Sequence, residues 1–168
     1  MARVTVSRVM PAPQAQVWAL ISDVANATRW NNSWSSIELT SQQTHGVGTA
    51  FRAHTKDGLA FDFVVTDWVS PEYISFTPIR EKSERYAITL ESHSFRLTPG
   101  GEDETLMELT AHASGHGVKG RVGIMFFWAG HQKQGLEMAL DSLEEVFAGP
   151  EEPAARGEPA PEESPPAK

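Results

Sequence analysis

The fold of this protein is decided by residues 118–147 near its C-terminal end, VKGRVGIMFFWAGHQKQGLEMALDSLEEVF. One set of side chains in this stretch recurs at spacings of three and four residues: Val122, Met125, Ala129, Gln132, Leu136, Leu140, Leu143 and Phe147. That spacing places them along one face of a helix. A helix of this length at the end of a strand-rich chain needs a large concave partner. We therefore expect the sequence before it to form a curved sheet.

The sequence before the predicted helix alternates between apolar and polar residues in separate runs, which is the pattern of β-strands. The predicted strands are residues 3–10, 35–42, 49–56, 59–69, 73–79, 86–97 and 105–113. The apolar phase reverses inside the sixth strand, and this reversal predicts a β-bulge near Glu91 and Ser92. Two short helices are predicted after the first strand, one from Pro13 to about Ser22 and one over residues 23–29.

The predicted helix also marks the end of the folded part. A length of 168 residues fits one domain, which we assign to residues 1–148. From Gly149 onward the composition changes to mostly Pro, Ala and Glu, with no aromatic or branched apolar residue. Such a segment cannot bury enough apolar surface to offset the cost of ordering it. We expect residues 149–168 to form a disordered tail.

Composition and charge disfavour several classes of protein. The chain has no cysteine and a formal net charge of −8. The lack of cysteine excludes a disulfide framework and a cysteine-ligated zinc site. The negative charge, without any basic run, disfavours nucleic-acid binding and attraction to anionic membranes. No run of about 18 apolar residues is present, so we expect no stable membrane insertion. Without an apolar leader segment, we expect a cytoplasmic location.

Short motifs, together with the order of predicted elements, resemble the START/Bet v 1-like (SRPBCC) superfamily, which includes polyketide cyclase/dehydrase-like proteins. The motifs are residues 10–13 (MPAP) with Val17 and Trp18, residues 22–23 (SD) followed by Arg29 and Trp30, and residues 95–99 (FRLTP) before a glycine turn. The resemblance covers about residues 4–147. It implies an α+β helix-grip fold, in which a seven-stranded antiparallel sheet curls around a long C-terminal helix and leaves a cavity between them.

The functions that this resemblance implies are diverse. The superfamily includes carriers of sterols, lipids and plant hormones, aromatic polyketide cyclases, and co-chaperones that stimulate Hsp90. Its oxygenase subunits bind iron through a His-x4-His motif with a downstream Asp, and this chain lacks that motif. The histidines outside the sixth strand show no metal-ligand spacing: His45, His54, His112, His116 and His131. We therefore expect no metal and no cofactor.

The candidate ligand-binding residues follow from the strand phases. By phase, an aromatic-rich set should face the helix: Phe51, Phe61, Phe63, Phe76, Phe95 and Met107, with Ile74 and Leu109 beside them. This set fits either a packed core or the wall of a ligand pocket. The dense apolar C-terminal half of the helix predicts a closed end. Met125, Ala129 and Gln132 are adaptable, small and polar, so we expect the pocket beside them.

Polar side chains on the inward phases are the candidates for contacts with a ligand. A buried amide without a partner costs about 1–3 kcal/mol, so Gln132 should bond a ligand, a water or a polar group of the sheet. His93 is either a satisfied core histidine or a general acid/base for a ligand carbonyl. Asp67 is a further candidate, and we assign no catalytic residue. Trp30 and Trp34 either pack between the sheet and the short helices or line the pocket mouth.

Phe127 lies opposite the predicted stripe, given about 100° of rotation per helical residue. It is expected to meet a loop or a partner, or to be exposed. An exposed apolar patch there would favour a dimer contact or a mobile lid. We therefore expect either a monomer or a homodimer.

Our leading hypothesis is a protein that binds a small hydrophobic or amphipathic ligand of lipid-, polyketide- or aromatic-like character. Burial of apolar ligand surface would supply most of the affinity. One alternative is an aromatic polyketide cyclase/dehydratase, although the sequence lacks the dense cluster of inward Arg, Tyr and His that we expect of one. Another is a co-chaperone-like protein-interaction module.

Overall fold

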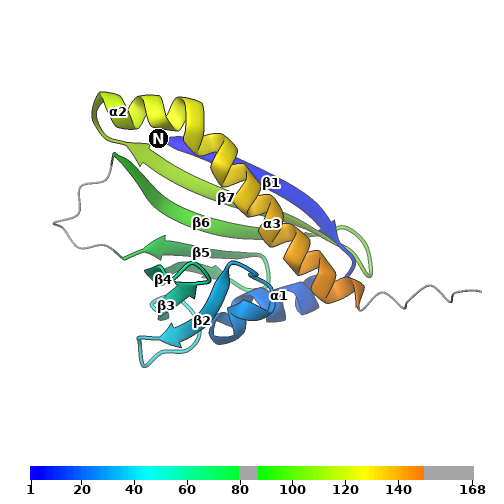
Figure 1. Cartoon of the computed structure of the whole chain (residues 1–168). Helices are drawn as coiled ribbons and strands as arrows, with labels where there is room; N and C mark the ends of the chain where they lie inside the picture. Colours follow the sequence, from blue (N-terminus) through cyan, green and yellow to red (C-terminus); the bar gives the residue numbers. More distant parts are fainter. Residues whose placement is uncertain (80–86, 150–168) are drawn as a thin grey trace, which may run out of the picture.

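The computed structural model describes residues 1–79 and 87–149, without the side chain of Met125. Its strands form one antiparallel sheet in the order β1-β7-β6-β5-β4-β3-β2 (Figure 1). The strands are β1 (Ala2–Met10), β2 (Trp34–Leu39), β3 (Ala50–Thr55), β4 (Ala60–Val69), β5 (Tyr73–Pro78), β6 (Ile88–Pro99) and β7 (Thr105–Gly115). Neighbours in the sheet are neighbours in sequence, except that β1 pairs with β7. The predicted tail beyond Gly149 and the first residue of the predicted sixth strand, Tyr86, lie outside the described residues.

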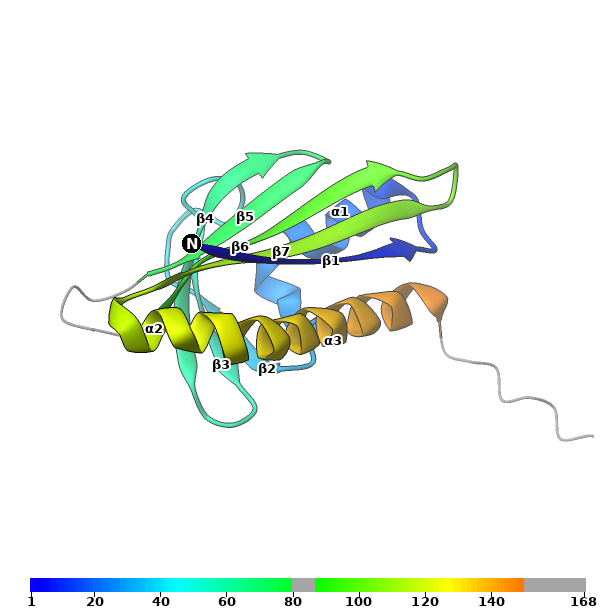
Figure 2. The same ribbon diagram turned by 90° about the horizontal axis from the view of Figure 1, so that it is seen from above.

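The helices lie between and after the strands. They are α1 (Gln14–Ser22), the 3-10 helix η1 (Val24–Arg29), α2 (Gly117–Gly123), the π-helical turn η2 (Ile124–Trp128) and α3 (Ala129–Ala148). The last three follow one another without a break and run along the sheet, as both views show (Figures 1 and 2). A curled sheet of seven antiparallel strands that holds a long C-terminal helix is the α+β helix-grip fold, so the predicted fold class is confirmed. No helix in the described part of the chain is long and apolar enough to cross a membrane.

Register shifts in the sheet, of which those in β4 and β6 matter most here, change which side chains face inward. The register of β6 against β7 shifts between Leu90 and Ser92, which confirms the predicted bulge. The register of β4 against β5 shifts between Val65 and Asp67. This second bulge reverses the phase, so that Trp68 packs edge-on against Trp18 with ring centroids 5.2 Å apart. Asp67 is exposed as a result, and its prediction as an inward polar group is wrong.

The second half of α3 closes one end of the space between helix and sheet. Leu136, Leu140 and Leu143 are all buried in the core, as the sequence predicts for this half. The core continues through the inner face of the sheet to α1 and η1, and Trp30 on the loop after η1 is 1% exposed. The rigid part of the molecule is therefore this end, where burial of apolar surface supplies most of the stability.

The π-helical turn accounts for part of the difference between the predicted and the observed first half of the long helix. A π turn holds more residues than an α turn, so the face presented to the sheet shifts along the sequence. The half-buried residues are Ile124 and Trp128, and Trp128 packs against the core. Val122 and Ala129 are exposed, so their prediction as members of the inward stripe is wrong. The side chain of Met125 lies outside the described residues.

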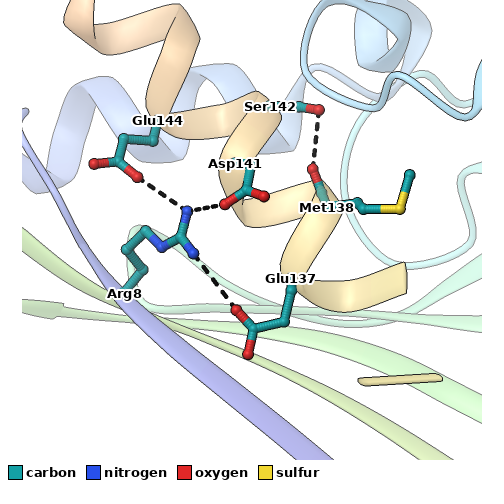
Figure 3. A network of polar contacts seen from close by, with 6 residues as sticks. All are labelled: Arg8, Glu137, Met138, Asp141, Ser142 and Glu144. Atoms are coloured by element: carbon teal, nitrogen blue, oxygen red, sulfur yellow. Dashed lines mark hydrogen bonds and ion pairs between the residues drawn. The ribbon is translucent and has the colours of Figure 1, made fainter. Parts of the chain in front are cut away.

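An ion-pair network fastens β1 to α3 on the outer side of the closed end (Figure 3). The guanidinium of Arg8 donates to the carboxylates of Asp141, Glu144 and Glu137, with the last two contacts at 3.0 and 3.5 Å. The hydrogen bond to Asp141 and the charges of Asp141 and Glu144 hold the pKa of Arg8 above its usual value. The three carboxylates lie on one helix face, so without Arg8 they would repel one another.

We expect Arg8→Met to lower the free energy of unfolding by about 1 kcal/mol, because partly exposed ion pairs contribute a few tenths of a kcal/mol each and the carboxylates lose their common counter-charge. Urea denaturation at low salt measures the change, and the difference from wild type should shrink in high salt. Arg52→Met is the matched control. Arg52 forms its ion pair with one carboxylate, that of Asp62 on the adjacent strand. Arg52→Met should therefore lose less free energy of unfolding than Arg8→Met. Equal losses would contradict the role given to the network.

Candidate functional site

A cavity of about 280 Å³ lies between the inner face of the sheet and α3. Its wall includes Phe61, which is 46% exposed, and the exposed Gly135 of α3. These two residues mark a mouth between β4 and the helix, so the cavity communicates with solvent.

Seven of the nineteen residues that line the cavity are Phe or Trp. The rings belong to Trp30, Trp34, Phe51, Phe61, Phe63, Phe76 and Phe95. Alternation along the strands and the strand register bring them together, since Phe51 pairs with Phe63 on the neighbouring strand, and their rings stack at 5.4 Å. Phe76 meets Phe95 edge-to-face at 5.6 Å. Such contacts are favourable beyond the apolar area that they bury, so the rings form a preorganised wall.

Trp30 and Trp34 serve both of the roles left open by the sequence. Their rings lie 5.9 Å apart, and Trp30 also packs edge-to-face on Phe95 at 5.4 Å. Both line the cavity, so they pack against the sheet and face the hollow. The indole N–H of Trp30 is buried without a hydrogen-bond partner in the described structure, an arrangement that costs about 1–3 kcal/mol.

The helix side of the cavity lies further along the chain than the sequence predicts. It consists of Gln132, Gly135, Leu136 and Ala139. Ala129 does not line the cavity: it lies on nearly the same side of α3 as Leu136, seven residues later, but it is exposed because the cavity ends before the first turn of α3. Met107 is also absent from the wall: it is fully buried opposite Arg8, at the level where the helix closes the sheet.

The polar centre of the cavity is a contact between the sheet and the helix. Gln132 Nε2 donates to His93 Nε2 at 3.0 Å, which confirms the prediction that Gln132 needs a partner and identifies that partner as a polar group of the sheet. With Nε2 as the acceptor, the neutral imidazole carries its proton on Nδ1. Burial lowers the pKa of His93 to about 4, so the ring is neutral at physiological pH.

Several polar wall residues were missed by the sequence reasoning. They are Asn31, Ser33, Thr55, Ser94 and Thr110. Ser94 and Thr110 are buried partners across β6 and β7, directly after the bulge that changes the phase of β6. Asn31 and Ser33 lie in the loop between η1 and β2, where no periodicity exists to place a side chain. Among the described residues no group of three or more His, Cys, Asp or Glu is placed to hold a metal ion.

An apolar cavity between a curled sheet and a C-terminal helix defines the class of helix-grip proteins that enclose small molecules. Residues 1–148 match the family model described as polyketide cyclase/dehydrase and lipid transport, and the chain belongs to this family. No curated protein sequence matches the chain.

Solved structures with low sequence identity share the fold. An uncharacterised protein from Bacillus thuringiensis has 17% identity and a TM-score of 0.71, with 88% of this chain and 100% of that chain covered. A START superfamily protein from Mycobacterium smegmatis has 15% identity and a TM-score of 0.63, covering 87% and 97%. A norcoclaurine synthase point mutant from Thalictrum flavum, in complex with a transition-state analogue, has 12% identity and a TM-score of 0.66, covering 88% and 94%.

Proposed function

We propose that this protein binds a compact, predominantly aromatic ligand in the cavity between the sheet and α3. The observation that carries the proposal is the wall of seven aromatic side chains around a single sheet-to-helix polar pair. Binding pockets combine an apolar lining with a few placed polar groups in this way. The proposed binding residues are those that line the hollow: Trp30, Trp34, Phe51, Phe61, Phe63, Phe76, His93, Phe95 and Gln132.

The size of the cavity limits the ligand class. An apolar cavity of about 150 Å³ holds one benzene, so 280 Å³ corresponds to a molecule of about two fused or linked rings. A long acyl chain would extend through the mouth. Among lipid-, polyketide- and aromatic-like ligands, the volume and the ring-rich wall favour the aromatic kind, because aromatic pairs add to the affinity from area burial.

The polar pair gives the ligand an orientation. Gln132 occupies Nε2 of His93, which leaves the Nδ1–H of the neutral ring as a donor without a hydrogen-bond partner among the described residues. A ligand carbonyl or phenol oxygen is its complement. Ser94 and Thr110 alternate with the inward residues of their strands, and the Thr110 hydroxyl shares a hydrogen bond with that of Thr5 on β1, so these two hydroxyls are not assigned to the ligand.

Simple binding fits the site better than catalysis of the cyclase/dehydratase type. Among the described residues that line the cavity, His93 is the only one with a titratable side chain. A general base works best with a pKa near the working pH, and burial holds that of His93 at about 4. The ring is therefore a weak base at neutral pH and acts as a hydrogen-bonding group.

The test blocks the mouth with Gly135→Phe and measures binding of methyl naphthyl ketone by calorimetry. A side chain at Gly135 starts in open space, and replacing a helical glycine favours the helix, so the variant should fold. The new ring would deprive the ligand of about 60 Å² of apolar contact with the wall, which corresponds to roughly 1.5 kcal/mol of binding free energy. We therefore expect the Kd of the ketone to rise about tenfold or more.

The matched control is Gly130→Phe. Gly130 lies on the same helix with the same open surroundings, but it does not line the cavity. Its Kd should stay within about twofold of wild type, as for surface changes away from a site. Equal affinity of wild type and Gly135→Phe for the ketone would overturn the proposed binding site. Mass spectrometry of the intact protein under native conditions would then show whether a co-purified ligand sits elsewhere.

A further inference from the structure

The outer face of the long helix, away from the cavity, carries an apolar stripe in contact with solvent. Val118, Val122 and Phe126 recur every four residues and are 80%, 45% and 67% exposed. Phe127, next to them, is 73% exposed. These two exposed phenylalanines and two exposed valines lie along roughly two and a half turns of helix and form an apolar surface, and such surfaces mark interaction sites. We call these four residues the outer stripe.

The π turn creates this surface. With the wider turn at residues 124–128, Ile124 and Trp128 face the sheet and Phe126 follows Val122 on the outside. An uninterrupted α-helix would rotate these positions differently, as the sequence pattern predicts. The exposed rings are thus a consequence of how the helix is wound, and they occur on α2 and η2, at the end of the long helix opposite the closed end of the fold (Figure 2).

The segment that carries the outer stripe has a charge opposite to that of the whole chain. The net charge is −8, yet residues 109–136 contain no Asp or Glu. They contain Lys119, Arg121 and Lys133, all exposed, which stand within a few residues of the stripe on α2 and early α3. The net charge of the whole chain is therefore a poor guide to this helix segment, which carries cations and no carboxylate.

We propose that the outer stripe and its three cations dock the protein on the surface of an anionic lipid bilayer. An apolar helix face flanked by Lys and Arg is the arrangement that lies in a membrane interface, with the rings among the acyl chains and the cations at the lipid phosphates. The contact is peripheral, since none of the described helices can span a bilayer. This surface is separate from the cavity wall, and the proposal does not depend on the ligand.

Charge complementarity favours a bilayer over a second copy of the chain. A symmetric dimer through this face would place the same patch on both sides of the contact. The cations Lys119, Arg121 and Lys133 of the two copies would then approach each other, which opposes association. An anionic bilayer neutralises the same cations and takes up a convex helix face without needing a matching groove.

The experiment is co-sedimentation of the full chain with vesicles of phosphatidylcholine alone and of phosphatidylcholine mixed with phosphatidylglycerol. Wild type should bind the anionic vesicles and bind them less in high salt, and its binding to neutral vesicles should be much weaker. Lys119→Gln/Arg121→Gln should reduce the partition coefficient by about fivefold for each cation removed. Phe126→Gln/Phe127→Gln should reduce it on anionic vesicles by about tenfold or more.

The controls change the same residue types away from the face. Lys56→Gln removes an exposed cation at the β3–β4 turn, and Val47→Gln removes a 55% exposed apolar side chain. Both should bind vesicles as wild type does. Failure of wild type to bind anionic vesicles, or equal binding by the variants and wild type, overturns the proposal. So does a wild-type dimer in light scattering that Phe126→Gln/Phe127→Gln converts to monomer, because the stripe would then be a subunit interface.

Discussion

Gly120→Ala should lower the free energy of unfolding by about 3 kcal/mol, the upper end of the usual cost of overpacking. A Cβ built on Gly120 lies 2.0 Å from the carbonyl oxygen of Ala87 and 3.1 Å from the carbonyl carbon of Gly115. The first of these contacts is impossible without movement, and the obstacle is backbone, which cannot turn aside as a flexible side chain does. The helix would have to move away from the start of β6.

The close approach exists because α2 must turn back on the sheet within a few residues of β7. His116 N donates to Ala87 O at 2.8 Å, and Gly117 takes a φ of +66°, which favours glycine. A displaced α2 would carry η2 and the first turns of α3 with it. We therefore expect Gly120→Ala to weaken ketone binding as well as stability, since Gln132 would shift relative to His93.

Gly130→Ala is the control, with an expected change of the opposite sign. A Cβ on Gly130 meets nothing within 4 Å, so alanine there should stabilise the protein by about 0.5–1 kcal/mol through its higher helix propensity. Urea denaturation gives both values from the midpoint at constant m-value. Similar small changes for the two substitutions would show that the helix does not press on Ala87 in solution.

The sheet and its inward aromatic residues could be predicted because their cause is local. Alternation with a period of two assigns each strand residue to a face, and this reasoning places Phe51, Phe63, Phe76 and Phe95 correctly on the inner side. The bulge in β6 was visible as a phase reversal within one strand. The bulge in β4 was not, because Trp68 also fits the outward phase of an unbroken strand.

The helix side of the site could not be predicted from periodicity alone. A period of 3.6 residues assigns Val122 and Ala129 to the inward face, but the π turn between them shifts the face of Val122, and Ala129 is exposed because the sheet does not cover the first turn of α3. The position of a π turn depends on how Trp128 and Ile124 pack on the sheet, which is a tertiary effect. Gln132 lies nearer to Leu136 on the same helix, within hydrogen-bond distance of His93, and its predicted place on the inward face was correct.

Acid should destabilise the protein through His93. Its pKa falls from 6.5 in the unfolded chain to about 4 in the native protein, owing to burial. Between these two pH values the unfolded state binds the proton and the native state does not. The contribution of the neutral His93 ring to the free energy of unfolding is therefore fully present above pH 6.5 and is lost as the pH falls toward 4. The integrated loss between pH 7 and pH 4 is about 3 kcal/mol.

The comparison that isolates His93 is the same pH series on His93→Gln. Glutamine does not titrate in this range and can still form a hydrogen bond with Gln132. Between pH 7 and pH 4 the variant should therefore lose about 3 kcal/mol less free energy of unfolding than wild type does. Subtracting the two profiles removes the contribution of every other carboxylate and histidine, provided that their surroundings are unchanged. Parallel profiles would mean that the ring is already reached by water and protons in the native state. The cavity would then be wet at His93, and the Nδ1–H would have water as its partner in place of a ligand oxygen.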